Sequence, residues 1–151
     1  GIVAATSRMP DRIVPSSLSE HYVHSIHSDW RGSWTFDLRW KPAEGFPVRA
    51  GWLAAIRRGH RAVAHGLSID VPILVMSSTR SVRPKAWDDV LHSADAVLDA
   101  ERIAQLAPRL GRHVTVVRID GGMHDLVLSG DAARAQVFAE LGRWTKAYLP
   151  E

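Results

Sequence analysis

Two short apolar runs, both rich in β-branched residues, constrain the fold of this chain more than any other feature. They occupy residues 71–76 (VPILVM) and 114–119 (VTVVRI). Continuous apolar runs that end at turn residues are typical of strands buried on both faces of a sheet. Apolar residues then recur every three to four positions over 96–110 and over 131–148, which predicts a helix after each strand. The order strand, helix, strand, helix predicts an α/β fold with a right-handed parallel βαβ unit.

Both helices of this unit have recognisable ends. Gly111 is expected to end the first helix, and Asp131 is expected to cap the second. Two strands cannot by themselves form a sheet that buries both of its faces and both of its edges. This half of the chain is therefore expected to be part of a larger sheet. The buried side of the last helix is expected to consist of Ala135, Val137, Phe138, Leu141, Trp144 and Leu149.

Residues 1–69 have a different character, with five of the eight histidines, four of the six tryptophans and an irregular apolar pattern. Ser17 and Glu20 have the spacing of a capping box at the start of a helix. The apolar stripe of that helix is expected to be Tyr22, Val23 and Ile26.

A loop or short edge strand is expected over residues 30–40, because aromatic and polar residues alternate there around Gly32. A second helix is expected over residues 48–65, ended by Gly66. The residues expected on one face of this helix are Trp52, Leu53, Ile56 and Val63.

Composition excludes several classes of protein. The 151 residues are 46% hydrophobic, which excludes a disordered chain, and no apolar run approaches the ~18 residues of a membrane span. The net charge of +3 reflects a small excess of arginine and does not indicate a nucleic-acid partner. The absence of cysteine excludes disulfides, thiolate catalysis and cysteine-based zinc sites, and it suits a reducing compartment such as the cytoplasm. The first residues lack the pattern of a signal peptide, and the absence of an initial Met predicts that the natural chain extends further upstream.

The most specific stretch for chemistry follows the second predicted strand, at residues 119–129 (IDGGMHDLVLS). Parallel α/β folds place their active groups at the carboxyl ends of strands. His124 lies just beyond such an end, after two glycines that permit a tight turn. An imidazole in this place can act as a general base at neutral pH. The alternative is a histidine that only fixes the loop by hydrogen bonds.

A candidate partner for this histidine is Asp95, in the segment 93–99 (SADAVLD) that follows the first strand after an insertion. A carboxylate there can accept the Nδ1–H of His124 and fix its tautomer. The alternative role of Asp95 is a helix N-cap, for which aspartate is a favoured residue. Asp99, one helical turn further on, competes as the orienting acid, and Asp88 and Asp89 are weaker rivals.

The sequence from the first strand through 93–99 and 121–126 (GGMHDL) to the last helix resembles the C-terminal part of the α/β-hydrolases. It is most similar to the group of serine aminopeptidases, lysophospholipases and monoacylglycerol lipases. The resemblance covers residues 70–150 and implies that Asp95 and His124 are the acid and base of a catalytic triad. It also implies a helical cap over residues 1–69 and the C-terminal part of the hydrolase core over residues 70–151.

Two departures from the family pattern concern the triad. The stretch 79–93 before Asp95 is longer than the two or three residues usual in the family. The family's nucleophile lies in a G-x-S-x-G elbow, and no such sequence occurs here. The nearest approach, at residues 66–70, lacks the closing glycine and precedes a strand, which excludes Ser68. The resemblance therefore implies an ester or lipid-ester hydrolase whose serine lies upstream of this chain, and predicts that the chain alone is inactive.

Other residue clusters have plainer interpretations. His21, His24 and His27 recur every third residue and offer a weak metal-site pattern, which the polar faces of a cap helix explain equally well. We expect no metal or other cofactor. The aromatic residues Trp30, Trp34, Phe36, Trp40, Phe46 and Trp52 either line an acyl pocket or pack the cap onto the core.

Two other functions remain as alternatives at this point. One is a non-catalytic folding module that forms a homodimer through an exposed sheet edge. The other is a fragment of a pseudoenzyme with a hydrolase fold.

Overall fold

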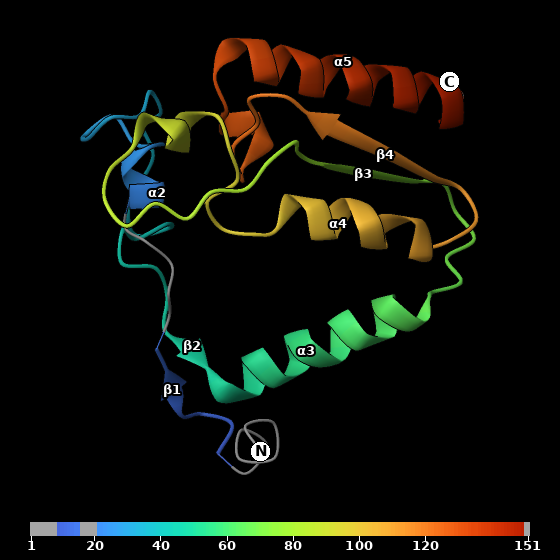
Figure 1. Ribbon diagram of the computed structural model, residues 1–151, viewed down its shortest axis with the longest axis horizontal. Coiled ribbons are helices and arrows are strands. Elements are labelled where there is room, and N and C mark those ends of the chain that lie inside the picture. Colours follow the sequence, from blue (N-terminus) through green and yellow to red (C-terminus); the bar gives the residue numbers. More distant parts are fainter. Residues whose placement is uncertain (1–8, 16–20, 150–151) are drawn as a thin grey trace.

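The computed structural model describes residues 9–15 and 21–149 (Figure 1). It is a mixed α/β structure with a parallel two-stranded sheet. In chain order the elements are β1 (Ile13–Val14), α2 (His21–His24), β2 (Val48–Arg49), α3 (Ala50–His65), β3 (Ile73–Ser78), α4 (Ala100–Leu106), β4 (Val114–Ile119) and α5 (Asp131–Tyr148). Single 3₁₀ turns lie at Asp89–His92, Ala107–Arg109 and Leu126–Leu128.

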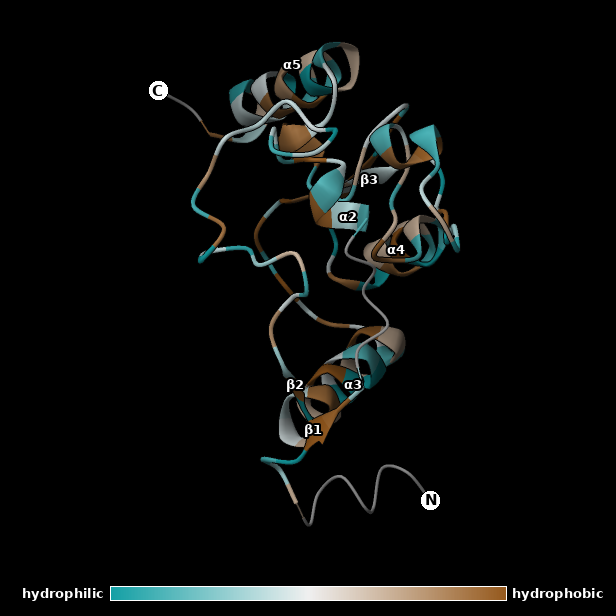
Figure 2. Cartoon of the chain, turned by 90° about the vertical axis from the view of Figure 1, so that its left-hand side faces the viewer, coloured by the Kyte–Doolittle hydropathy of each residue, from teal (hydrophilic) through white to brown (hydrophobic). Residues whose placement is uncertain are grey.

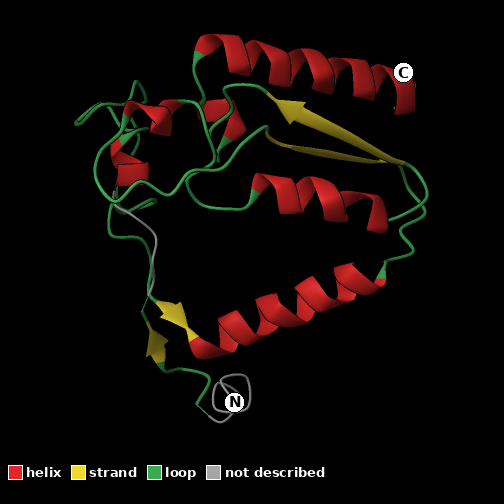
Figure 3. Cartoon of the chain, viewed as in Figure 1, coloured by secondary structure: helices red, strands yellow, loops and turns green. Residues whose placement is uncertain are grey.

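The two predicted strands pair in parallel, as expected. Ile73 lies opposite Val114 and Ser78 lies opposite Ile119, so both strands end at the same edge of the sheet. Helix α5 covers one face of this sheet and α4 covers the other (Figure 3). Ile119 at the end of β4 forms a buried cluster with Ala133 and Val137 of α5. No helix of the described residues is both long enough and apolar enough to cross a membrane.

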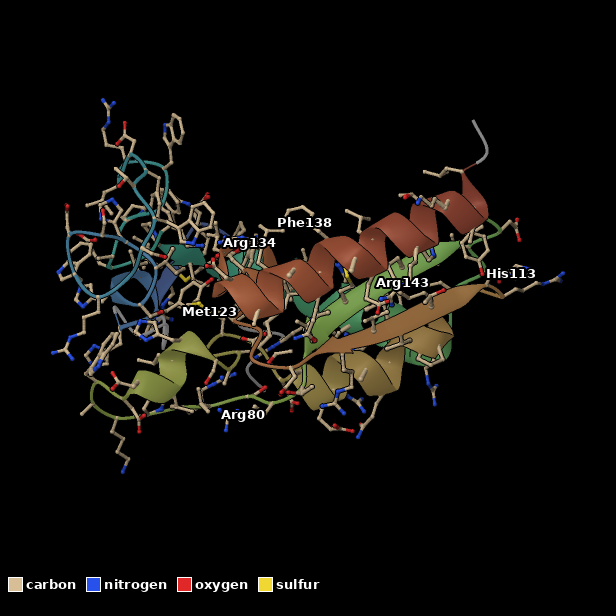
Figure 4. The ribbon with its side chains drawn as sticks, turned by 90° about the horizontal axis from the view of Figure 1, so that it is seen from above. Arg80, His113, Met123, Arg134, Phe138 and Arg143 are labelled. Atoms are coloured by element: carbon tan, nitrogen blue, oxygen red, sulfur yellow. The ribbon has the colours of Figure 1, made fainter. Side chains whose placement is uncertain are left out.

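The apolar side of α5 is less buried than its sequence predicts. Val137 is buried, whereas Phe138 is 55% and Leu149 61% exposed, and Ala135 and Leu141 are also exposed. Figure 4 shows Phe138 pointing away from β4, with His113 and Met123 at opposite ends of that strand. The prediction of one wide buried face was wrong, because two strands cover only a narrow strip of the helix. Asp131 is the first residue of the helix and Gly130 precedes it as the cap, so the predicted cap was one residue off.

Helix α4 begins later than predicted. The apolar spacing predicted a helix over 96–110, but Asp99 is the N-cap and its side chain accepts a hydrogen bond from the Arg102 N–H. The N–H of Ala100 bonds instead to the Ser81 hydroxyl at 2.8 Å. The α-helix ends at Leu106, because Pro108 has no N–H to continue the ladder and a 3₁₀ turn follows.

The second predicted helix of the N-terminal part is present, and an unpredicted strand pair precedes it. Helix α3 ends at Gly66 as expected. The φ of Gly66 is +98°, a conformation that favours glycine. The helix starts at Ala50 because residues 48–49 form β2, which pairs antiparallel with β1. On its expected face, Leu53, Ile56 and Val63 are half-buried, but Trp52 is 57% exposed.

Residues 21–47 pack against the end of the sheet. From that end, α2 lies in front of β3 (Figure 2). Tyr22, Val23 and Ile26 are buried together with Met123, which follows β4. The predicted apolar stripe is therefore present although α2 has only four residues. The capping box of Ser17 and Glu20 lies outside the described residues.

The β3–β4 sheet has two strands in the described part of the chain. β3 and β4 each pair with one strand only among the described residues, and residues 73–76 and 114–117 are half-buried rather than buried on both faces as predicted. A cavity of about 600 Å³ lies beside β3, between α3 and α4. Its apolar lining includes Val63, Val75, Ile103 and Leu106.

Candidate active site

Two side chains that are 29 residues apart in the sequence meet at the carboxyl edge of the sheet. The Nδ1 of His124 lies 3.1 Å from Oδ2 of Asp95. The Asp95 side chain is only 4% exposed, whereas the His124 side chain is 28% exposed. The acid is therefore buried behind an imidazole that reaches solvent. Among residues 9–15 and 21–149, no hydrogen bond engages the Nε2 of His124.

A tight turn after β4 carries His124. Gly121 has φ +68°, a conformation that favours glycine. A Cβ on Gly122 would lie 2.7 Å from the Leu126 side chain, so a side chain there would displace a packed neighbour. The turn is also held by the Ser129 hydroxyl, which accepts the N–H of Met123 at 2.9 Å. Both glycines are thus needed to bring His124 over the end of the sheet.

The insertion 79–93 does not move Asp95 away from the strand end. Asp95 forms an isolated parallel bridge with Ser81, three residues beyond β3. Its N–H donates to the Arg80 carbonyl at 3.0 Å, and its carbonyl accepts the Val82 N–H at 2.9 Å. The insertion therefore closes on itself as a loop, and Asp95 returns to the edge of the sheet.

The two carboxylate oxygens of Asp95 have separate partners. Oδ1 accepts the backbone N–H groups of Val97 and Leu98, each at 2.7 Å, while Oδ2 faces His124. Burial alone would raise the pKa of this carboxyl. The hydrogen bonds from His124 and from the backbone of Leu98 and Val97 outweigh burial and hold its pKa below the usual value. Asp95 is therefore an ionised acceptor at neutral pH.

The other candidate acids accept hydrogen bonds from residues close to them in the sequence. Asp99 caps α4, Asp88 caps the 3₁₀ turn 89–92 through the Val90 N–H, and Asp89 accepts the indole N–H of Trp87. None of them has a hydrogen bond to His124 in the described part of the chain.

A second polar group adjoins the pair and was not foreseen from the sequence. Asp125, the residue after His124, accepts hydrogen bonds at Oδ2 from the Tyr22 hydroxyl and from the Lys41 ammonium, the latter at 2.6 Å. Tyr22 was expected only as an apolar residue of the first helix. The one sequence signal was a carboxylate directly after the candidate base, and nothing in the sequence pointed to Lys41.

The environment shifts the pKa of two groups in this cluster. Burial raises the pKa of the Tyr22 phenol far above its usual range, and the nearby Asp125 carboxylate raises it further. Burial alone would raise the pKa of Asp125. The hydrogen bonds from Lys41 and Tyr22 outweigh burial and hold the pKa of that carboxyl below its usual value. At neutral pH the phenol is therefore a donor and the carboxylate an acceptor.

Two of the N-terminal histidines have contacts to aromatic rings or to the backbone. His24 stacks on Trp30 at 4.3 Å, and the Nε2–H of His27 donates to the Phe36 carbonyl at 3.0 Å. Across residues 9–15 and 21–149, no group of three or more metal-ligating side chains is arranged to hold an ion.

The aromatic residues of this part divide into two groups. Trp34 and Phe36 pack on the buried cluster around Ile26, and the Trp34 indole N–H donates to the Leu128 carbonyl. The exposed members are Trp30, Trp40, Phe46 and Trp52.

The geometry of the pair allows a specific chemistry. With Nδ1–H held by a buried carboxylate, the neutral imidazole has its lone pair on Nε2, which makes no hydrogen bond within the described residues. Such a group can take a proton from a hydroxyl and later return it to a leaving group. Comparison with models of protein families, with curated proteins and with solved structures gave no match for this chain.

Proposed function

We propose that Asp95 and His124 are the acid and base of a Ser–His–Asp triad in a serine hydrolase of the α/β-hydrolase fold. The observation that carries this proposal is the 3.1 Å contact between a buried carboxylate and Nδ1 of a histidine whose Nε2 is unengaged in the described residues. The buried acid favours the tautomer with the proton on Nδ1, which leaves Nε2 as the atom that can accept a proton. The proposed acid also lies at the carboxyl edge of a parallel sheet, where such sites are found.

In this mechanism Nε2 of His124 takes the proton of a serine hydroxyl as the serine oxygen attacks the carbonyl carbon of a carboxylic ester. Asp95 stabilises the imidazolium that forms. The imidazolium then gives its proton to the departing alcohol, which leaves an acyl-enzyme. A water molecule attacks this intermediate with His124 again as base, and the acid product is released. Lipid esters and small acyl esters are the substrate class that the family resemblance implies.

The serine is proposed to lie upstream of this chain, on a strand that extends the sheet beside β3. The unpaired edge of β3 and the apolar cavity next to it support this placement. A parallel strand added there would end at the same edge as Asp95 and His124. Residues 1–69 would then be the cap and 70–151 the C-terminal part of the core. The lack of cysteine favours action in the cytoplasm.

Ester hydrolysis by the natural protein that contains these residues tests the proposal. His124→Ala is expected to lower kcat by roughly 10³-fold or more, because the serine loses its base. His113→Ala is the matched control, since this exposed histidine lies at the other end of β4. Equal kcat for wild type and His124→Ala would exclude the proposed role.

A second candidate is a non-catalytic module that pairs with another copy of itself. Both outer sheet edges are unpaired among the described residues, and Phe138 of α5 and Leu149 just after it are exposed. Light scattering separates the two functions. A dimer of the 151-residue chain that Phe138→Glu converts to a monomer would favour the module. A monomer at all concentrations would argue against it.

A further inference from the structure

We infer that Tyr22 and Lys41 are positioning residues for the His124 imidazole and act on it through Asp125. The inference rests on the proposed function, because it concerns the same base. Tyr22 and Lys41 belong to the segment 21–47, while Asp125 follows His124 on the turn after β4. The three side chains form what we call the Asp125 clamp.

The first half of the clamp is a closed pair of hydrogen bonds between Tyr22 and Asp125. The Tyr22 hydroxyl donates to Oδ2 of Asp125 and accepts the backbone N–H of the same residue at 3.2 Å. One phenol therefore fixes both the side chain and the main chain of the residue next to the base. Tyr22 is 3% exposed, so this hydroxyl would be costly to leave without partners.

The second half of the clamp is charged. The Lys41 ammonium donates to the same Oδ2 at 2.6 Å and also lies 5.0 Å from the centre of the Tyr22 ring. Both side chains of the ion pair are about one-third exposed, at 36% and 33%. Lys41 therefore holds the carboxylate by a charge-assisted hydrogen bond and the phenol ring by a cation–π contact.

The clamp also touches the imidazole directly. The Tyr22 ring packs edge-on against the His124 ring, with centroids 5.8 Å apart and planes at 73°. The imidazole is thus bounded by Asp95 at Nδ1 and by the Tyr22 ring on its side. Rotation of the imidazole toward this side is opposed by a buried tyrosine.

The charges of the Asp125 clamp also bear on which carboxylate binds the imidazole. Two carboxylates lie near the imidazole: Asp95 binds Nδ1, and Asp125 interacts with the ring electrostatically. Tyr22 and Lys41 saturate Oδ2 of Asp125, and Lys41 offsets its charge. Asp95 is then the carboxylate that binds the imidazole. Without the clamp, Asp125 would compete for the same proton and turn Nε2 away from the serine.

The test follows the Nδ1 proton of His124 by NMR in protein labelled with ¹⁵N in its histidines. In the wild type this proton is expected to be protected from exchange with water, because it is held by a buried carboxylate. Lys41→Met keeps the aliphatic stem and removes the charge, and should speed that exchange about fivefold to tenfold. Tyr22→Phe keeps the ring and should act in the same direction. Lys41→Arg retains the cation and should restore protection.

Arg39→Met is the matched control, because it breaks an ion pair with Asp37 in the same segment without touching the clamp. Unchanged proton exchange and imidazole ¹⁵N shifts in both Lys41→Met and Tyr22→Phe would overturn the inference while leaving the Asp95–His124 pair intact. If Asp95→Asn left the exchange rate of the His124 Nδ1 proton as it is in the wild type, the proposed function would be overturned instead. In the active natural protein, Lys41→Met is expected to lower kcat and leave KM unchanged, as a loss of alignment requires.

Discussion

At the scale of single residues, the two carboxylate oxygens of Asp95 make different contacts. The prediction that Asp95 is a helix N-cap was wrong, because Asp99 caps α4, but Oδ1 binds the backbone N–H groups of Val97 and Leu98 in the turn before that helix. Its second oxygen meanwhile faces His124. The backbone bonds hold the carboxylate in the orientation that the imidazole needs. The sequence alone could not assign these contacts, because an aspartate offers the same two oxygens to backbone N–H groups and to an imidazole.

Asp95→Asn separates these contacts. The amide oxygen can still accept from Val97 and Leu98, but an NH₂ group then faces Nδ1 and favours the wrong tautomer of His124. We expect kcat of the natural protein to fall by roughly 10³–10⁴-fold. Asp99→Asn is the control, because asparagine is an equally good N-cap for α4 and kcat should stay within about twofold. A similar kcat for both variants would contradict the assignment of Asp95.

The lowered pKa values of Asp95 and Asp125 predict that the folded chain loses stability at acid pH. Each carboxylate is stabilised in its charged form in the folded chain, so the folded-state pKa lies below the unfolded value of about 3.9. The contribution to stability is complete above about pH 5 and is lost as pH falls through the folded-state values. The melting temperature should therefore decline below about pH 4. Asp125→Asn should make that decline shallower, and an unchanged slope would contradict the shift.

At the scale of elements, the sequence predicted the bounds of strands and helices best where the backbone hydrogen bonds follow the apolar pattern. Strand β4 has the predicted bounds and α3 ends at the predicted glycine. The start of α4 was missed, because Asp95 binds the N–H groups of Val97 and Leu98 in a turn and Asp99 then becomes the N-cap. The β1–β2 pair was missed as well, since strands of two residues carry no alternation to detect.

Glycine substitutions test the turn that holds His124. Gly121→Ala places a Cβ at φ +68°, and Gly122→Ala places one 2.7 Å from the Leu126 side chain. Each is expected to lower the free energy of unfolding by about 1–2 kcal/mol. Gly142→Ala is the matched control, because this glycine lies within α5 with open space around it. There we expect a gain of roughly 0.5–1 kcal/mol. Denaturant unfolding measures all three, and a stabilising Gly121→Ala would contradict the turn geometry.

At the scale of the whole molecule, the small size of the β3–β4 sheet explains why the predictions of full burial were wrong. Full burial of the strands and of α5 was predicted from their apolar residues, yet residues 73–76 are half-buried and Phe138 is exposed. In the described residues, the two strands β3 and β4 cover only part of these apolar side chains. The packing of residues 21–47 on the sheet edge was beyond sequence reasoning, because Tyr22 and Lys41 meet Asp125 only after the chain has folded.

The most direct test of the proposed triad is to label the natural protein with a fluorophosphonate, which reacts with activated serines, and to locate the label by mass spectrometry. We predict one labelled serine, in a G-x-S-x-G turn upstream of these 151 residues, and no label in the His124→Ala variant. The 151-residue chain by itself should not react. Equal labelling of wild type and His124→Ala, or a label on a serine within this chain, would contradict the proposal that Asp95 and His124 activate an upstream serine.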